Sequence, residues 1–110
     1  MKKNSKHDNL VMIVYKELQD RGFNDIHKEY EYCSRNKKFQ GIYGEIDVFC
    51  KNYDYRLVFE CKSNKTYKSF KKAKEQLSRS NKCFFYKDKR IFNFLIYYDK
   101  QNKVVYEWVR

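Results

Sequence analysis

The chain has 110 residues, 42% of them hydrophobic and 19% aromatic, which fills one small core and leaves no run able to cross a bilayer. Its formal charge of +11 predicts a polyanionic partner such as DNA or RNA, although a generally basic surface is an alternative. Because there is no secretory h-region, C-x-x-C motif or zinc spacing, we expect a soluble intracellular protein, in a host cell if viral, with reduced and mostly buried cysteines.

The first part of the chain predicts a basic arm and a helix. Met1–Lys6 is expected to be a flexible arm, and residues 8–21 are expected to form a helix that Gly22 ends. Glu17 lies at the edge of the apolar stripe, where it could reach a site as an extra ligand or simply face solvent. His7 is interpreted as a helix-start residue rather than a general base. The stripe itself consists of Leu10, Val11, Val14 and Leu18.

A hairpin follows a first strand and a basic loop. Residues 26–33 alternate as a strand, and residues 34–40 form a loop in which Lys37 and Lys38 are candidate nucleic-acid contacts. Residues 44–48, extending to Cys50, and residues 57–62 predict two apolar strands, joined by the polar turn 51–54. Period-two alternation would place Ile46, Val48 and Cys50 on one face of the first of these strands.

Acidic residues and a lysine are placed regularly in this hairpin. Alternation puts Glu45 and Asp47 on one face of the first strand, and Glu60 and Lys62 on one face of the second. With the carbonyl of Cys61, the carboxylates of Asp47 and Glu60 offer a hard oxygen site for Mg²⁺, for which Mn²⁺ can substitute. Such a site suits phosphodiester hydrolysis, with Lys62 as the catalytic cation and Glu45 as an accessory residue. A half-buried ion pair of Asp47, Glu60 and Lys62 is the alternative.

A second helix is predicted over residues 66–80. Its apolar stripe contains Phe70, Ala73 and Leu77, and Gln76 lies where this stripe meets a basic row. We expect Gln76 to position water or phosphate. The row could be a solvated face, but its place beside the acidic strands favours DNA contact. Its members are Lys65, Lys68, Lys72 and Arg79.

The chain ends with two predicted strands, residues 92–98 and 104–109, joined by the turn 99–102. Their aromatic residues could mediate a homodimer or lie in the core, which is the commoner place for strand aromatics. These residues are Tyr97, Tyr106 and Trp108. Since no linker or repeat divides residues 1–110, we expect a single domain.

The acidic strands G-E-I-D and F-E-C-K resemble the PD-(D/E)xK, or restriction-endonuclease-like, nuclease superfamily, over about residues 8–98. The resemblance implies an α/β fold with a mixed central sheet flanked by helices, in the order αβββαββ. It assigns the two family acids to Asp47 and Glu60, the lysine to Lys62, and a site-bordering glutamine to Gln76. Among small members the chain is similar to archaeal Holliday junction resolvases and YraN-like nucleases. It lacks the proline before Asp47, and only Asp8 could replace the acid that resolvases carry early in their first helix.

Three functions of different kinds follow. The first is a Mg²⁺-dependent endonuclease acting on DNA, with structure-selective cleavage ranked above sequence-specific restriction because so short a chain leaves little room for base reading. A junction-resolving role would require a homodimer. The second is a non-catalytic nucleic-acid-binding domain of the same fold. The third is a structural basic protein, which would bind no divalent metal.

Overall fold

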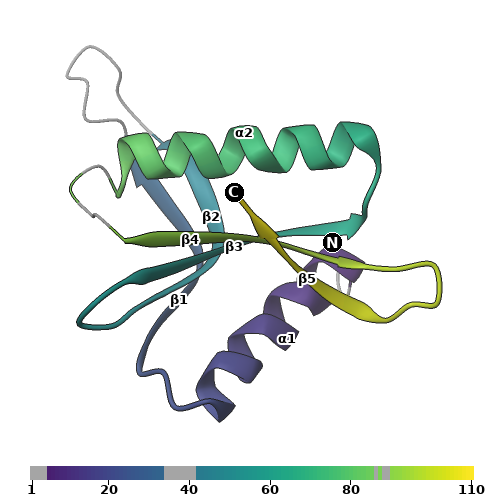
Figure 1. Ribbon diagram of the computed structural model, residues 1–110, viewed down its shortest axis with the longest axis horizontal. Coiled ribbons are helices and arrows are strands. Elements are labelled where there is room, and N and C mark those ends of the chain that lie inside the picture. Colours follow the sequence, from purple (N-terminus) through teal and green to yellow (C-terminus); the bar gives the residue numbers. More distant parts are fainter. Residues whose placement is uncertain (1–4, 34–41, 86, 88–89) are drawn as a thin grey trace.

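The computed structural model describes residues 5–33, 42–85, 87 and 90–110 (Figure 1). The predicted order of one helix, three strands, one helix and two strands is confirmed. The loop carrying Lys37 and Lys38 lies outside the described residues. The elements are α1 (Lys6–Asp20), β1 (Asp25–Cys33), β2 (Ile42–Lys51), β3 (Arg56–Asn64), α2 (Tyr67–Cys83), β4 (Ile91–Tyr98) and β5 (Val104–Val109).

Capping residues explain where the helices begin. The Ser5 hydroxyl accepts a hydrogen bond from the Asp8 amide at 3.1 Å, so α1 begins at Lys6, within the expected arm. Thr66 and Ser69 form a capping box in which each side chain accepts from the other residue's amide. α2 therefore begins at Tyr67, one residue after the predicted start at residue 66, and it runs to Cys83 rather than residue 80. None of the described helices is long and apolar enough to span a membrane.

The five strands form one mixed sheet in the order β1-β2-β3-β4-β5. β1, β2 and β3 pair antiparallel, β3 and β4 pair parallel through the α2 crossover, and β5 returns antiparallel to β4. α1 lies on one face of the sheet and α2 on the other (Figure 1). The protein is therefore an α/β domain with a mixed central sheet flanked by helices, as predicted at this level.

Each face of the sheet has its own apolar cluster. The buried side of α1 packs on Val48, Cys50, Phe59 and Cys61, whereas Leu77 of α2 packs in a separate cluster that contains Tyr32, Ile46, Phe49, Val58 and Phe85. All four cysteines are free, and burial raises the pKa of the Cys50 thiol to about 12. Cys50 and Cys61 are buried as expected, but Cys33 is exposed.

Side-chain alternation is interrupted in the middle of β1 and β2. Ile46 packs on the α2 side while Val48 packs on the α1 side, so the prediction that they share a face is wrong. In β1, His27 and Tyr30 are three residues apart, yet both rings contact Phe49. Between them Glu29 has a φ of 50°, a left-handed conformation that is uncommon for a residue with a side chain. Both strands thus switch faces at the same rung, and Asp47 occupies the switch position of β2.

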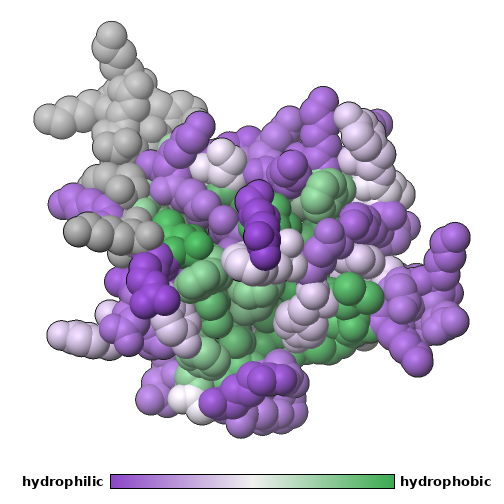
Figure 2. All heavy atoms as spheres, viewed as in Figure 1, coloured by the Kyte–Doolittle hydropathy of each residue, from purple (hydrophilic) through white to green (hydrophobic). Residues whose placement is uncertain are grey.

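β5 forms one edge of the sheet and carries exposed aromatic residues. Tyr106 is 43% exposed and Trp108 49%, whereas Tyr97 is partly buried and donates its hydroxyl to Glu107 at 3.1 Å. Figure 2 shows apolar side chains at the surface around β4 and β5, between the hydrophilic surfaces of the two helices. Tyr106 and Trp108 are therefore open to a partner, and the homodimer remains a prediction.

Candidate active site

The acidic site lies where β2 and β3 part. Their ladder runs from Lys51 and Arg56 to Val48 and Phe59, and the next rung would place Asp47 opposite Glu60. Beyond that point β2 continues its pairing with β1, and β3 its pairing with β4. The Cys61 amide donates to Asp47 Oδ2 at 2.8 Å. Where the two strands diverge, the Asp47 carboxylate thus accepts a hydrogen bond that a backbone carbonyl would accept in a regular ladder. The hairpin thus brings Asp47 to Glu60, as the sequence predicted.

Asp47 and Glu60 are buried together, at 5% and 3% exposure. Burial raises the pKa of Glu60 well above its usual range, and the charge of Asp47 raises it further. Burial also acts to raise the pKa of Asp47, but hydrogen bonds with His7, Glu60 and the Cys61 amide lower it overall. The proton that this pair shares is therefore held more tightly by Glu60 than by Asp47. A divalent cation is the natural replacement for that proton.

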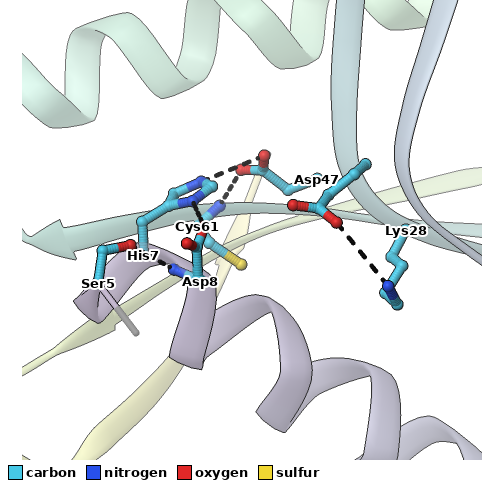
Figure 3. A network of polar contacts seen from close by, with 7 residues as sticks. Ser5, His7, Asp8, Lys28, Asp47 and Cys61 are labelled. Carbon is cyan, nitrogen blue, oxygen red and sulfur yellow. Dashed lines mark hydrogen bonds and ion pairs between the residues drawn. The ribbon is translucent and has the colours of Figure 1, made fainter. Parts of the chain in front are cut away.

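His7 is a site residue that the sequence analysis missed. Its Nε2 lies 3.2 Å from Asp47 Oδ1, and its Nδ1 lies 3.5 Å from Asp8 Oδ1 (Figure 3). The hydrogen bond to Asp47 raises the pKa of His7. His7 does start the helix, but it stands three residues before the buried Leu10, so helical spacing could have indicated that it faces the sheet. Asp8, the candidate for the early helix acid, contacts His7.

Lys62 and Gln76 meet on the α2 side of the sheet. Lys62 Nζ donates to Gln76 Oε1 at 2.8 Å, joining the end of β3 to the middle of α2. Lys62 also lies close enough to Glu60 for its charge to act against the raised Glu60 pKa. The structure therefore brings together four of the predicted residues, Asp47, Glu60, Lys62 and Gln76, on three elements.

The two accessory acids differ in position. Glu45 lies at the exposed rim, where partial burial and the neighbouring charge of Asp47 raise its pKa. Glu17 is ten residues after His7 on α1, roughly 15 Å along the helix axis. Its carboxylate accepts from Arg21 Nε at 2.7 Å. The accessory role predicted for Glu17 is therefore wrong, because the other end of α1 is the one that meets the site.

α2 presents most of the predicted basic row. Lys68, Lys72 and Arg79 are exposed, and a shallow groove lined by Lys68, Lys72 and Lys62 leads from this row towards the site. Lys65 instead donates to Glu107 at 2.8 Å, with its Nζ 4.8 Å from the centre of the Phe70 ring. Its charge is thus partly neutralised within the protein. The remaining lysines of the row are better placed to meet phosphates.

The donors at the split in the sheet suit a hard divalent cation. Carboxylate oxygens of Asp47 and Glu60 adjoin one another, and oxygen is the donor that Mg²⁺ prefers. The N–H and C=O of one strand residue point to the same side, so we expect the Cys61 carbonyl to face the same gap as its amide. In the described part of the chain, no three His, Cys, Asp or Glu side chains are already arranged as a metal site.

Comparison of the chain with family models, with curated proteins and with solved structures finds no match. The functional argument therefore depends on the site itself.

Proposed function

We propose that this protein is a metal-dependent nuclease that hydrolyses DNA phosphodiester bonds, and that its sheet and helices form a restriction-endonuclease-like core. The observation that carries the proposal is the buried Asp47–Glu60 pair at the split between β2 and β3, with Lys62 two residues further on. Two adjoining buried acids destabilise a fold unless a proton or a cation compensates them. A purely structural ion pair would not need the second acid.

Each residue of the site has a distinct task in this proposal. Asp47, Glu60 and the Cys61 carbonyl would hold Mg²⁺, or Mn²⁺ in its place, and Glu60 would release its proton on binding. The bound ion would acidify the attacking water and offset charge on the phosphate. Lys62 would place a positive charge beside the phosphoryl oxygens as negative charge develops there. Gln76 holds the ammonium of Lys62 in position, which limits the reorganisation needed during reaction.

The basic surface of α2 supports a nucleic-acid substrate. Lys68 and Lys72 would neutralise backbone phosphates and guide the strand towards Lys62 along their shared groove. Phosphate contacts of this kind position a substrate without reading its sequence, which favours structure-selective cleavage. Resolution of a four-way junction would require two copies of the site, and the exposed β5 edge would be a suitable place for them to associate.

The test is cleavage of labelled duplex, single-stranded, flap, four-way-junction and RNA substrates, with Mg²⁺, with Mn²⁺ and with chelator. We expect metal-dependent cleavage of DNA that Lys62→Met abolishes. Lys100→Met, an exposed lysine of the β4–β5 turn, is the matched control and should keep full activity. If the protein binds the substrates but cleaves none of them, the non-catalytic nucleic-acid-binding domain would be favoured over the enzyme. Equal cleavage by both variants would exclude this site as its source.

A further inference from the structure

The His7 imidazole is placed like a metal ligand supported by a neighbouring carboxylate. Its Nδ1 lies beside Asp8, 3.5 Å away, and its Nε2 points to Asp47 Oδ1, 3.2 Å away (Figure 3). In metal sites, a carboxylate on one ring nitrogen fixes the orientation of the ring and leaves the other nitrogen for the ion. The ring is 37% exposed, so an ion can reach it from solvent.

The spacing of the two facing atoms suits a shared ion. Adjacent ligands of an octahedral ion, each bound at about 2.1 Å, are about 3.0 Å apart, which is √2 times the bond length. The measured separation of His7 Nε2 and Asp47 Oδ1 is 3.2 Å. Asp47 Oδ2 is already bonded to the Cys61 amide at 2.8 Å, so Oδ1 is the oxygen that faces the histidine. An ion could replace the direct contact with little movement of α1 or β2.

We infer that His7 is a ligand of the ion that the proposed function requires, and that this nitrogen makes the site select Mn²⁺ over Mg²⁺. The inference rests on the proposed function and specifies its cofactor. Mg²⁺ is held by oxygen ligands and gives up its waters reluctantly, whereas imidazole is a good ligand for divalent transition ions. With His7 as a ligand, the ion would have one nitrogen beside the carboxylate oxygens of Asp47 and Glu60, whereas Asp47, Glu60 and the Cys61 carbonyl alone would offer it only oxygen.

The experiment measures ion binding without any substrate. Loss of the free Mn²⁺ electron paramagnetic resonance signal is titrated with the full chain, and Mg²⁺ is added as competitor. The wild type should bind Mn²⁺ at least about tenfold more tightly than Mg²⁺. His7→Gln should lose about tenfold or more in Mn²⁺ affinity while its Mg²⁺ affinity changes little. His27→Gln is the matched control, since His27 is the other histidine and pairs with Asp25 on β1, at 2.6 Å.

A second readout uses the unmodified protein. Substoichiometric Mn²⁺ should broaden the imidazole nuclear magnetic resonance signals of His7 strongly and those of His27 much less. If Asp47→Asn removes Mn²⁺ binding but His7→Gln does not, the ligand role of His7 is refuted and the proposed function stands. If the wild type binds neither ion, with or without DNA, the proposed function itself is refuted, and the inference about His7 falls with it.

Discussion

The buried carboxyl of Glu60 predicts a specific pH dependence of stability. Its pKa in the folded protein is well above its usual value of about 4.3, because the side chain is only 3% exposed and lies beside Asp47. Between these two pKa values the folded chain holds a proton that the unfolded chain has released. The stabilising contribution of Glu60 is therefore complete below about pH 4.3 and decreases as the pH rises to the folded pKa, by up to about 1.4 kcal/mol per pH unit.

Substitution Glu60→Gln isolates this contribution, because the amide is close in shape and does not titrate. From pH 4.3 to pH 6, roughly 1.7 units, the free energy of unfolding of the wild type should fall by up to about 2.3 kcal/mol more than that of the variant. Urea unfolding from pH 4.3 to 7.5 with chelator present, followed by Trp108 fluorescence, measures the change. Glu75→Gln, an exposed α2 acid, is the control and should follow the wild type. A Glu60→Gln difference that stays constant across this pH range would refute the proton-sharing pair.

Three further predictions concern the basic surface and the backbone. Replacing Lys68 and Lys72 by Gln should weaken DNA binding, which fluorescence anisotropy measures. The slope of log affinity against log salt should become shallower by about 0.9 for each phosphate that the protein no longer neutralises. An unchanged slope would show that DNA binds elsewhere. Gly44→Ala should lower the free energy of unfolding by about 1–3 kcal/mol, because the new Cβ would lie 2.5 Å from the hydroxyl oxygen of the buried Tyr32. An unchanged urea midpoint would contradict this close approach. Glu29→Gly should leave the free energy of unfolding equal or higher. Glu29→Val should lower it by about 1–3 kcal/mol, because a β-branched residue disfavours the positive φ of this position. Equal urea midpoints of the two variants would argue against the left-handed backbone.

Local sequence signals account for most of what could be predicted. Helical spacing, the polar turn before β3 and the apolar runs were sufficient for the order of elements, because each depends on neighbouring residues. The contact between Asp47 and Glu60 followed from hairpin register alone. The resemblance and the place of Gln76 on its helix indicated that Gln76 borders the site, but not that it accepts a hydrogen bond from Lys62. Glu17 was misplaced because a helical wheel shows which face a residue occupies and not which end of the helix meets the sheet.

The position of Asp47 depends on a feature that residue patterns do not reveal. In a regular strand its side chain would point to one face, with Val48 and Ile46 together on the other. The interruption opposite Glu29 separates Ile46 from Val48, and the Asp47 carboxylate meets both His7 from the α1 side and Glu60 of β3. Non-glycine residues seldom adopt a positive φ, so a glutamate gives no warning of the switch. The same irregularity that defeated the period-two prediction allows one carboxylate to join α1, β2 and β3 in a single site.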